Sequence, residues 1–297
     1  MRIIRTSLVL LALLSSLAWA EEVLHFSVHD GKPLLRICEQ LEEKFHWRIS
    51  YEDPPIYWQD ELQQGVAPSG TPWLVLHPVS LSVDIAIRPN PGGLSAQNAL
   101  ERILPTEPKR TAFKTILGAY HGNLNRDVYR VIESDDFIHI VPTAVRDENG
   151  TLRPFQPLLD TRITIPKGKY LLLTLVSQII AQVSNKTGMR VFEGTIPMNL
   201  FTQMQMTEEA NDEAARDVLE RVFNKVDEQP PAQNLPPFRL TWYLGFSHNG
   251  QNYFMNIHAV GPEQGDSALA NSQTSQPAVG PKPKASNEPS PYNKKGK

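Results

Sequence analysis

Apolar residues follow a helical period in two well-separated segments of the chain. In each segment, apolar side chains recur every three or four residues. This spacing gathers them on one face of a helix, so the sequence predicts a helix in each segment. The residues that set the period are Leu34, Ile37, Cys38, Leu41 and Phe45 in the first segment and Leu172, Leu175, Val176, Ile179 and Val183 in the second.

Strand patterns surround both predicted helices in the same order. A short extended segment precedes each helix, another follows it, and a stretch with a period of two comes next. The expected strands are 25–28, 48–51 and 83–87 in the first region and 162–165, 189–192 and 200–206 in the second.

A second helix and a closing hairpin are expected in each region. Ser95 and Thr207 are residues that cap helix starts, and Glu208 and Glu209 then fall in a first turn, where carboxylates favour the helix dipole. Pro105 is expected to end the first region's helix. The hairpins are expected at 128–133 with 137–141 and at 238–246 with 252–260, the latter with a type I′ turn at Asn249-Gly250.

The two regions therefore show one pattern used twice, with the order of matching segments kept throughout. The predicted fold class is α+β, with two repeated β-α-β-β-α-β-β domains in which small mixed sheets pack on two helices. The expected boundaries are a first domain at 21–145 with loop insertions at 54–78 and 105–127, a linker at 146–160 and a second domain at 161–260.

The two ends of the chain have a different composition from the regions between them. Two arginines, an apolar run from Thr6 to Trp19 and the sequence Ala18-Trp19-Ala20 predict a signal peptide at 1–20. No later stretch is long and apolar enough for an integral membrane span. Residues 261–297 are rich in Pro, Ser and Lys and are predicted to be a disordered tail. The predicted location is periplasmic or secreted.

Charge and cysteine content exclude some classes of function. Removing the signal peptide with its two arginines leaves 27 basic and 32 acidic residues, a net charge of −5. A nucleic-acid binder needs a basic face, so nucleic acid is not expected as a partner. Cys38 is the only cysteine, which rules out an intrachain disulfide and favours a small apolar core residue.

Three stretches resemble a known domain family. "PLLRICEQL" (33–41) follows an extended segment and a turn, "KTGMRVFEG" (186–194) places a glycine before an aromatic strand, and "LSAQNALERIL" (94–104) has strands behind it. The chain resembles tandem secretin and TonB short N-terminal (STN) domains, with no outer-membrane barrel expected after them. This resemblance implies a periplasmic docking module for another protein.

The sequence holds no recognisable catalytic motif. Zinc-protease, serine-hydrolase, phosphate-binding and dinucleotide-binding signatures are all missing, so no catalytic residue, cofactor or metal is expected. One alternative stays open: His25, His29 and His139 could cluster around a metal ion, which would make the protein a metal-dependent hydrolase.

The best candidates for binding lie in the first insertion. Tyr57, Trp58, Trp73 and Leu74 are large apolar residues among prolines and glycines, and aromatic anchors carry much of the energy of interfaces. The predicted function is therefore an exported, non-enzymatic protein that binds or scaffolds another envelope protein. Two alternatives remain: these residues fold back to cap a sheet or fill the interface between copies, or the lysines of the tail bind cell wall or another polyanion.

Overall fold

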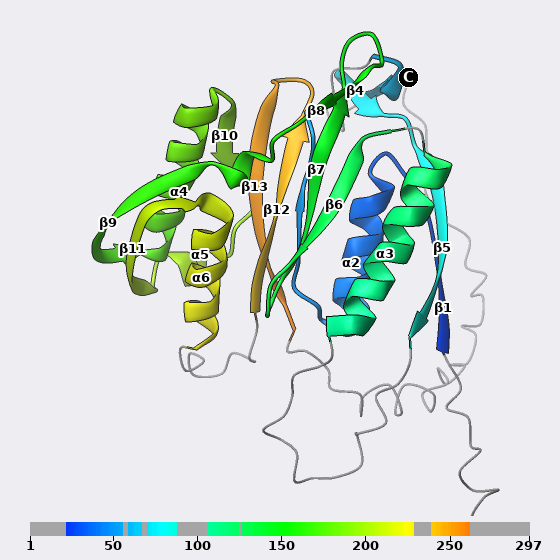
Figure 1. The fold of residues 1–297 in the computed structure, drawn as a ribbon. Helices are drawn as coiled ribbons and strands as arrows, with labels where there is room; N and C mark the ends of the chain where they lie inside the picture. The colour runs from blue at the N-terminus through cyan, green and yellow to red at the C-terminus, as the bar shows by residue number, and fades with distance from the viewer. Residues whose placement is uncertain are drawn as a thin grey trace, which may run out of the picture. The chain divides into compact units, whose positions relative to one another are not determined.

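The computed structural model describes residues 22–55, 59–66, 70–87, 106–124, 126–228 and 239–261. These residues form a mixed α+β fold with several sheets and five α-helices (Figure 1). The predicted signal peptide and, apart from Gly261, the predicted C-terminal tail lie outside the described residues. None of the described helices is long and apolar enough to cross a membrane.

The first half of the chain runs from β1 to β7. Its elements are β1 (Glu22–Asp30), α2 (Pro33–Phe45), β2 (Ile49–Glu52), a 3₁₀ turn η1 (Gln59–Glu61), β3 (Leu62–Val66), β4 (Pro72–Leu76), β5 (Val79–Ile87), α3 (Thr106–Asn123), β6 (Val128–Glu133) and β7 (Ile138–Arg146).

The second half follows β8 (Leu152–Pro154) and a second 3₁₀ turn, η2 (Leu158–Asp160). Its elements are β9 (Arg162–Leu171), α4 (Leu172–Thr187), β10 (Arg190–Glu193), α5 (Met198–Phe201), β11 (Gln205–Ala214), α6 (Ala215–Asp227), β12 (Arg239–Ser247) and β13 (Asn252–Val260).

Strand pairing repeats between the halves. An antiparallel pair, β1 with β5, corresponds to β9 with β11. A parallel pair, β2 with β7, corresponds to β10 with β13, and each is extended by an antiparallel strand, β6 or β12. The halves join where β12 pairs in parallel with β2, which gives a continuous sheet in the order β10-β13-β12-β2-β7-β6, with β8 beside β7.

Helices of the two halves cover opposite faces of this sheet. Tyr51 of β2 lies beside Leu34 of α2, whereas Ser50, its neighbour in the strand, points to the other face. There Ser50 shares a hydrogen bond of 2.6 Å with His139, and the other ring nitrogen of His139 lies 3.1 Å from Glu220 of α6. Strand β2 is therefore buried on both faces, between α2 and α6.

The apolar period predicted for α2 and α4 is confirmed. All five residues that set it are buried in each helix. Cys38 is 2 % exposed, which confirms its place in the core. Burying an aliphatic side chain of this kind contributes about 1.5–3 kcal/mol, so these faces account for much of each half's stability.

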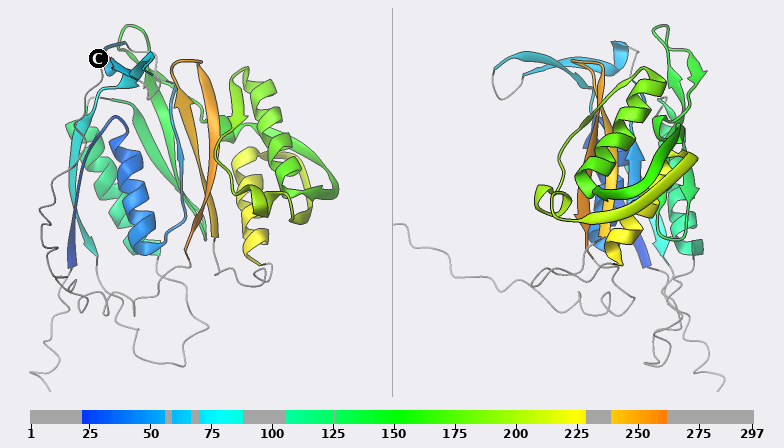
Figure 2. Two further views of the ribbon diagram at one scale, coloured as in Figure 1. Left: turned by 180° about the vertical axis from the view of Figure 1, so that it is seen from behind. Right: turned by 90° about the vertical axis from the view of Figure 1, so that its left-hand side faces the viewer.

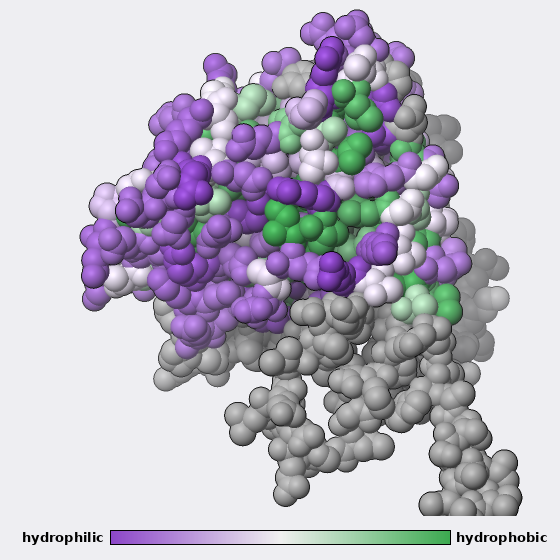
Figure 3. Space-filling view, in the orientation of Figure 1, coloured by the Kyte–Doolittle hydropathy of each residue, from purple (hydrophilic) through white to green (hydrophobic). Residues whose placement is uncertain are grey.

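Hydropathy differs across the face seen in Figure 3. Hydrophilic residues cover the surface over β9, β11 and α6, and hydrophobic residues gather nearer the middle, around β6. The segment between the halves is tied to the folded unit: β8 pairs with β7, and Leu158 and Leu159 are buried in the same apolar cluster as α4 and α6.

Helix α3 corrects one prediction. The loop insertion expected at 105–127 is wrong, because α3 occupies most of it. Ala112, Phe113, Ile116 and Tyr120 are buried at helical spacing. The helix expected from Ser95 to Pro105 lies outside the described residues.

A second correction concerns residues 200–214. The strand expected at 200–206 is wrong over most of its length, because α5 ends at Phe201 and β11 begins at Gln205. The helix start expected at Thr207 is also wrong, because β11 continues to Ala214. Met206, Glu208 and Ala210 are buried in alternation along β11. A charged residue at an inward position hid this period of two.

The turn between β12 and β13 also differs from expectation. A type I′ turn needs positive φ at both central residues, but the positive φ of 50° falls at Gln251 and not at Asn249 or Gly250. The two hairpin strands themselves are confirmed.

Candidate binding surface

The β3–β4 hairpin lies between β2 and β5 along the chain. At the corresponding place, between β10 and β11, the second half has only the short helix α5. Figure 2 (right) shows the hairpin reaching away from the central sheet. Its largest apolar side chains are open to solvent: Val66 is 72 % exposed, Trp73 45 % and Leu74 42 %. Exposed aromatic and aliphatic residues grouped on one element are typical of a protein-binding surface.

Glycine at position 65 allows the indole of Trp73 to lie across the hairpin. Gly65 pairs directly with Trp73, and a Cβ at this glycine would meet Nε1 of the indole at 3.1 Å and a methyl carbon of Val75 at the same distance. Strand β4 also contacts the second half, because the Leu74 amide donates a hydrogen bond of 3.2 Å to Oδ1 of Asn249. The hairpin is therefore held to both halves.

Two of the four predicted binding residues can be placed. Trp73 and Leu74 are neighbours on β4, and neither is buried against the sheet or between the halves. Tyr57 and Trp58 lie outside the described residues.

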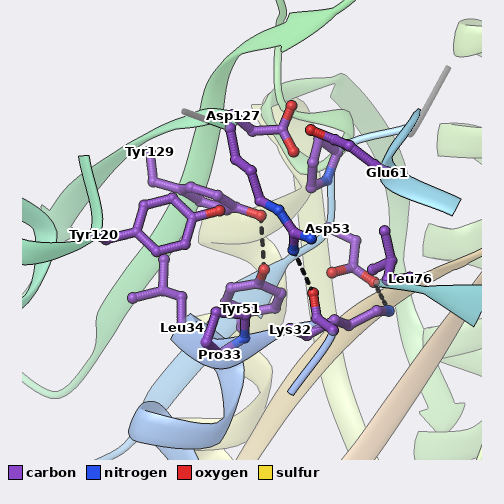
Figure 4. Close-up of a pocket in the computed structure, with 13 residues that line it drawn as sticks. Lys32, Pro33, Leu34, Tyr51, Asp53, Glu61, Leu76, Tyr120, Asp127 and Tyr129 are labelled. Carbon is purple, nitrogen blue, oxygen red and sulfur yellow. Dashed lines mark hydrogen bonds and ion pairs between the residues drawn. The ribbon is translucent and has the colours of Figure 1, made fainter. Parts of the chain in front are cut away.

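Polar and aromatic side chains converge at the base of the hairpin (Figure 4). Lys32 forms an ion pair with Asp53. The Tyr51 and Tyr129 hydroxyls share a hydrogen bond of 2.6 Å. The guanidinium of Arg126 donates to the carbonyls of Gly31 and His77, both at 2.8 Å. These contacts fix the segment that follows β4 to the start of α2.

Two buried carboxyls belong to the same cluster. Glu61 is 4 % exposed and Asp127 6 % exposed. Burial raises the pKa of both, that of Asp127 to about 7, with Glu61 adding to the rise at Asp127. Among the described residues, no hydrogen bond reaches Oε1 of Glu61.

Paired carboxyls with a raised pKa also occur in acid–base active sites. The space between the lining residues is only about 20 Å³, however, which is room for a single water molecule. The backbone hydrogen bond from the His77 amide to the Glu61 carbonyl, 2.8 Å, closes the two ends of the hairpin just beside this space. The cluster therefore suits an anchor for the hairpin and does not suit a substrate site.

A second surface lies beside α2, over β12 and β13. Figure 2 (left) shows no helix over these strands on the side where α2 lies. A groove of about 600 Å³ runs there, lined by α2 and by outward residues of the strands that include Tyr243 and Asn256. Phe254 is 36 % exposed on the same face, and its ring centre lies 5.9 Å from that of Phe192, which is 46 % exposed.

Sequence patterns missed this surface, although β13 carries a usable signal. Tyr253, Met255 and Ile257 are buried, and Phe254 and Asn256 alternate with them. Because Phe254 contacts the exposed ring of Phe192, the two form an apolar patch, which is more informative than a single exposed apolar residue.

The three histidines of the metal hypothesis are separate. His25 and His29 lie on β1 and contact β5. Nδ1 of His25 is 2.8 Å from Oδ1 of Asp84, and Nδ1 of His29 is 3.0 Å from Oγ of Ser80. His139 is buried in the central sheet between Ser50 and Glu220. Within the part of the chain that the structure describes, no group of three or more His, Cys, Asp or Glu side chains is placed to hold a metal ion.

Comparison of the chain with known protein families, with curated proteins and with solved structures finds no match. The candidate binding surface therefore rests on its own geometry and chemistry.

Proposed function

We propose that this protein is an exported, non-enzymatic component of the bacterial envelope that binds another envelope protein through the β3–β4 hairpin. The observation that carries the proposal is the pair Trp73 and Leu74, each more than 40 % exposed on a hairpin with a fixed base. A surface that is ordered before binding loses less conformational entropy on association, so such a hairpin suits a docking role.

Two further points support the proposal. The N-terminal segment has the composition of a signal peptide. Each half also has the β-α-β-β-α-β-β order that the resemblance to STN domains implies, with the hairpin added in the first half only. We infer that the repeated scaffold is a tandem STN-like unit and that the addition carries the partner specificity.

Photo-crosslinking tests the proposal directly. The full-length protein is produced in its envelope with a benzophenone amino acid in place of Trp73, and adducts are identified by mass spectrometry. A benzophenone at Val23, which is 60 % exposed on β1, serves as the control. We expect one dominant protein adduct at position 73 and none of that species at position 23.

A double variant, Trp73→Ala with Leu74→Ala, separates binding from folding. We expect it to lose at least ~90 % of partner capture while its free energy of unfolding stays within ~0.5 kcal/mol of the wild type, since both side chains are exposed. Capture that survives in the double variant, or adducts that form equally at positions 23 and 73, would disprove a role for the hairpin.

A further inference from the structure

The groove beside α2 has a wall of carboxylates. Glu39, Glu42 and Glu43 line this side, and no lysine or arginine is among the described residues that line the groove. Nε2 of His258 lies 3.0 Å from Oε2 of Glu42, whereas Glu43 is exposed. Arg36 contacts Glu39 at 2.7 Å, but Arg36 is not part of the lining. Glu39 and Glu43 therefore give the open side of the groove a negative charge.

The placement of these carboxylates costs the helix stability. Glu39 and Glu43 are four positions apart on α2, and like charges at this spacing repel each other on a helix surface. Glu43 also falls in the last turn of α2, which ends at Phe45. A carboxylate is unfavourable there because the carbonyl end of a helix is negative. A cation held against the two side chains would relieve both repulsions.

The floor of the groove is aromatic. Tyr243 of β12 lines it, and a Cβ at Gly245, two positions along the strand, would lie 2.7 Å from a ring carbon of Tyr243. The glycine therefore leaves room for the tyrosine ring to lie across the strand. Asn256 of β13 also lines the groove, and Phe254 and Phe192 continue the same face with their ring centres 5.9 Å apart. These rings form an aromatic platform beside the acidic wall.

An acidic wall beside an aromatic platform fits one kind of ligand. Lysine and arginine pair with carboxylates and also bind the faces of aromatic rings. Proline-rich segments dock in aromatic-lined grooves at a low entropic cost, because their extended conformation is already fixed. The groove, with a volume of about 600 Å³, has the size of a formed ligand site. Its charge favours a cationic segment and repels polyanions.

Pairing of such a segment with the edge of the sheet is less favourable here. β10 ends the central sheet, but it has only four residues, and the amide of Val191 already donates a hydrogen bond of 3.3 Å to Oγ of Ser184. A short edge with an occupied amide resists the addition of another strand. The side chains of the groove are therefore the better recognition surface.

We propose that the groove beside α2 binds an extended, proline-containing segment of another protein. The lysines or arginines of this segment pair with Glu39 and Glu43. Its prolines pack on Tyr243, Phe254 and Phe192. None of the described hairpin residues lines the groove, so the inference does not depend on a partner at the hairpin.

Titration with synthetic peptides, followed by NMR of the isotope-labelled full-length mature protein, tests the proposal. The probe is a short peptide in which two prolines precede each lysine. Two control peptides carry glutamate in place of lysine or glycine in place of proline. We expect the probe to shift the amide signals of Tyr243, Gly245 and Asn256 and to bind at least ~10-fold more tightly than either control. Because salt screens exposed charges, its affinity should fall severalfold between ~0.05 M and ~0.5 M salt.

A pair of charge variants tests the acidic wall. Glu39→Gln with Glu43→Gln should weaken binding of the probe about 5-fold, because two ion pairs are lost. Glu209→Gln with Glu228→Gln removes the same charge from positions that are exposed elsewhere and should leave the affinity unchanged. Amide signals outside the groove report that each variant is folded.

A second pair of variants tests the aromatic platform. Phe254→Ala should weaken binding of the probe about 5-fold, because a ring that contacts the prolines is lost. Val23→Ala, at an exposed apolar position on β1, should leave the affinity unchanged.

Several results would overturn the proposal. One is equal binding of the lysine and glutamate peptides, and another is equal weakening by the two charge variants. Spermidine, a free polyamine, bound at the same amides as tightly as the peptide would assign the wall to small amines. Groove signals that change with protein concentration alone would assign it to a second copy. Because no hairpin partner is present in these titrations, their outcome is independent of hairpin binding.

Discussion

An arginine at the same place in each half is buried in the first half and exposed in the second. Arg48 and Arg190 each follow, by two positions, the residue that ends a helix with positive φ, His46 or Gly188. The first arginine precedes β2, a strand with neighbours on both sides, and the second begins β10, which ends the sheet. Arg48 is 2 % exposed, whereas Arg190 is exposed.

Burial gives Arg48 a set of partners that crosses the junction between halves. Its guanidinium donates to the Leu240 carbonyl at 2.9 and 2.8 Å, lies 2.8 Å from a carboxylate oxygen of Asp227 and sits 3.8 Å from the ring centre of Phe137. Burial lowers its pKa to about 10, a fall that Asp227 opposes. The position of a strand in the sheet therefore decides whether an arginine is structural.

The largest expected effect comes from truncating this arginine. Arg48→Ala removes the guanidinium from the buried Asp227 carboxylate and from the Leu240 carbonyl, so we expect a loss of about 3–5 kcal/mol in the free energy of unfolding. The matched variant Arg190→Ala should change it by less than ~0.5 kcal/mol. Urea unfolding followed by circular dichroism measures both, and equal losses would contradict the comparison.

Two tryptophans extend the comparison to the hairpin. Trp242 is 1 % exposed in the core of the second half, so Trp242→Ala should cost about 3–5 kcal/mol. Trp73→Ala, on the exposed hairpin, should cost less than ~0.5 kcal/mol. A large loss of stability for Trp73→Ala, measured in the same urea titrations, would mean that the hairpin is part of the fold and not an addition to it.

A third expected effect depends on pH. The pKa of Asp127 is raised to about 7 in the folded protein, chiefly by burial, and is about 3.9 in an unfolded chain. The folded state therefore holds the extra proton between these values, and Asp127 destabilises the protein increasingly as pH rises from about 4 to 7. Asp127→Asn should gain stability relative to the wild type over this range and keep that gain above pH 7. A difference that is constant with pH, in unfolding measured from pH 4 to 8, would refute this.

The smallest effect is expected in the helical cores. Cys38 in α2 and Val176 in α4 are each the third of the five residues that set the buried period, and both are buried. Because the side chains are similar in volume, we expect Cys38→Val and Val176→Cys each to cost less than ~1.5 kcal/mol. Thermal unfolding measures both variants. A difference of more than ~2 kcal/mol between their losses in the free energy of unfolding would show that the helices are not equivalent.

Periodicity predicts those parts of the fold in which apolar residues alone face the core. Helices α2 and α4 follow from the spacing of their buried residues. β11 does not, because Glu208 occupies an inward position and is neutralised there by Arg221 and Lys225, which reach it at 2.9 and 2.7 Å. These two partners come from α6, so nothing local in the strand reveals that the carboxylate is inside.

The junction between the two halves could not be predicted from periodicity for the same reason. Glu52 and Arg216 are both buried, with 3.5 Å between their charged groups, and burial raises the pKa of Glu52 to about 7. Charged residues suggest a surface when the sequence is considered alone. In the candidate site, Trp73 and Leu74 could be chosen from composition, but the groove could not, because its residues come together from α2, β12 and β13.

Sharing one sheet between halves also sets an order of events during the synthesis of the protein. β2 ends at Glu52, but β12, which completes its edge, begins at Arg239. Until the ribosome has made α6 and β12, Arg48 lacks Asp227 and the Leu240 carbonyl, and Glu52 lacks Arg216. The face of the first half with these two residues therefore stays uncovered until almost the whole chain has been made. A chaperone that shields the face would act after β2 is made and before β12 is made.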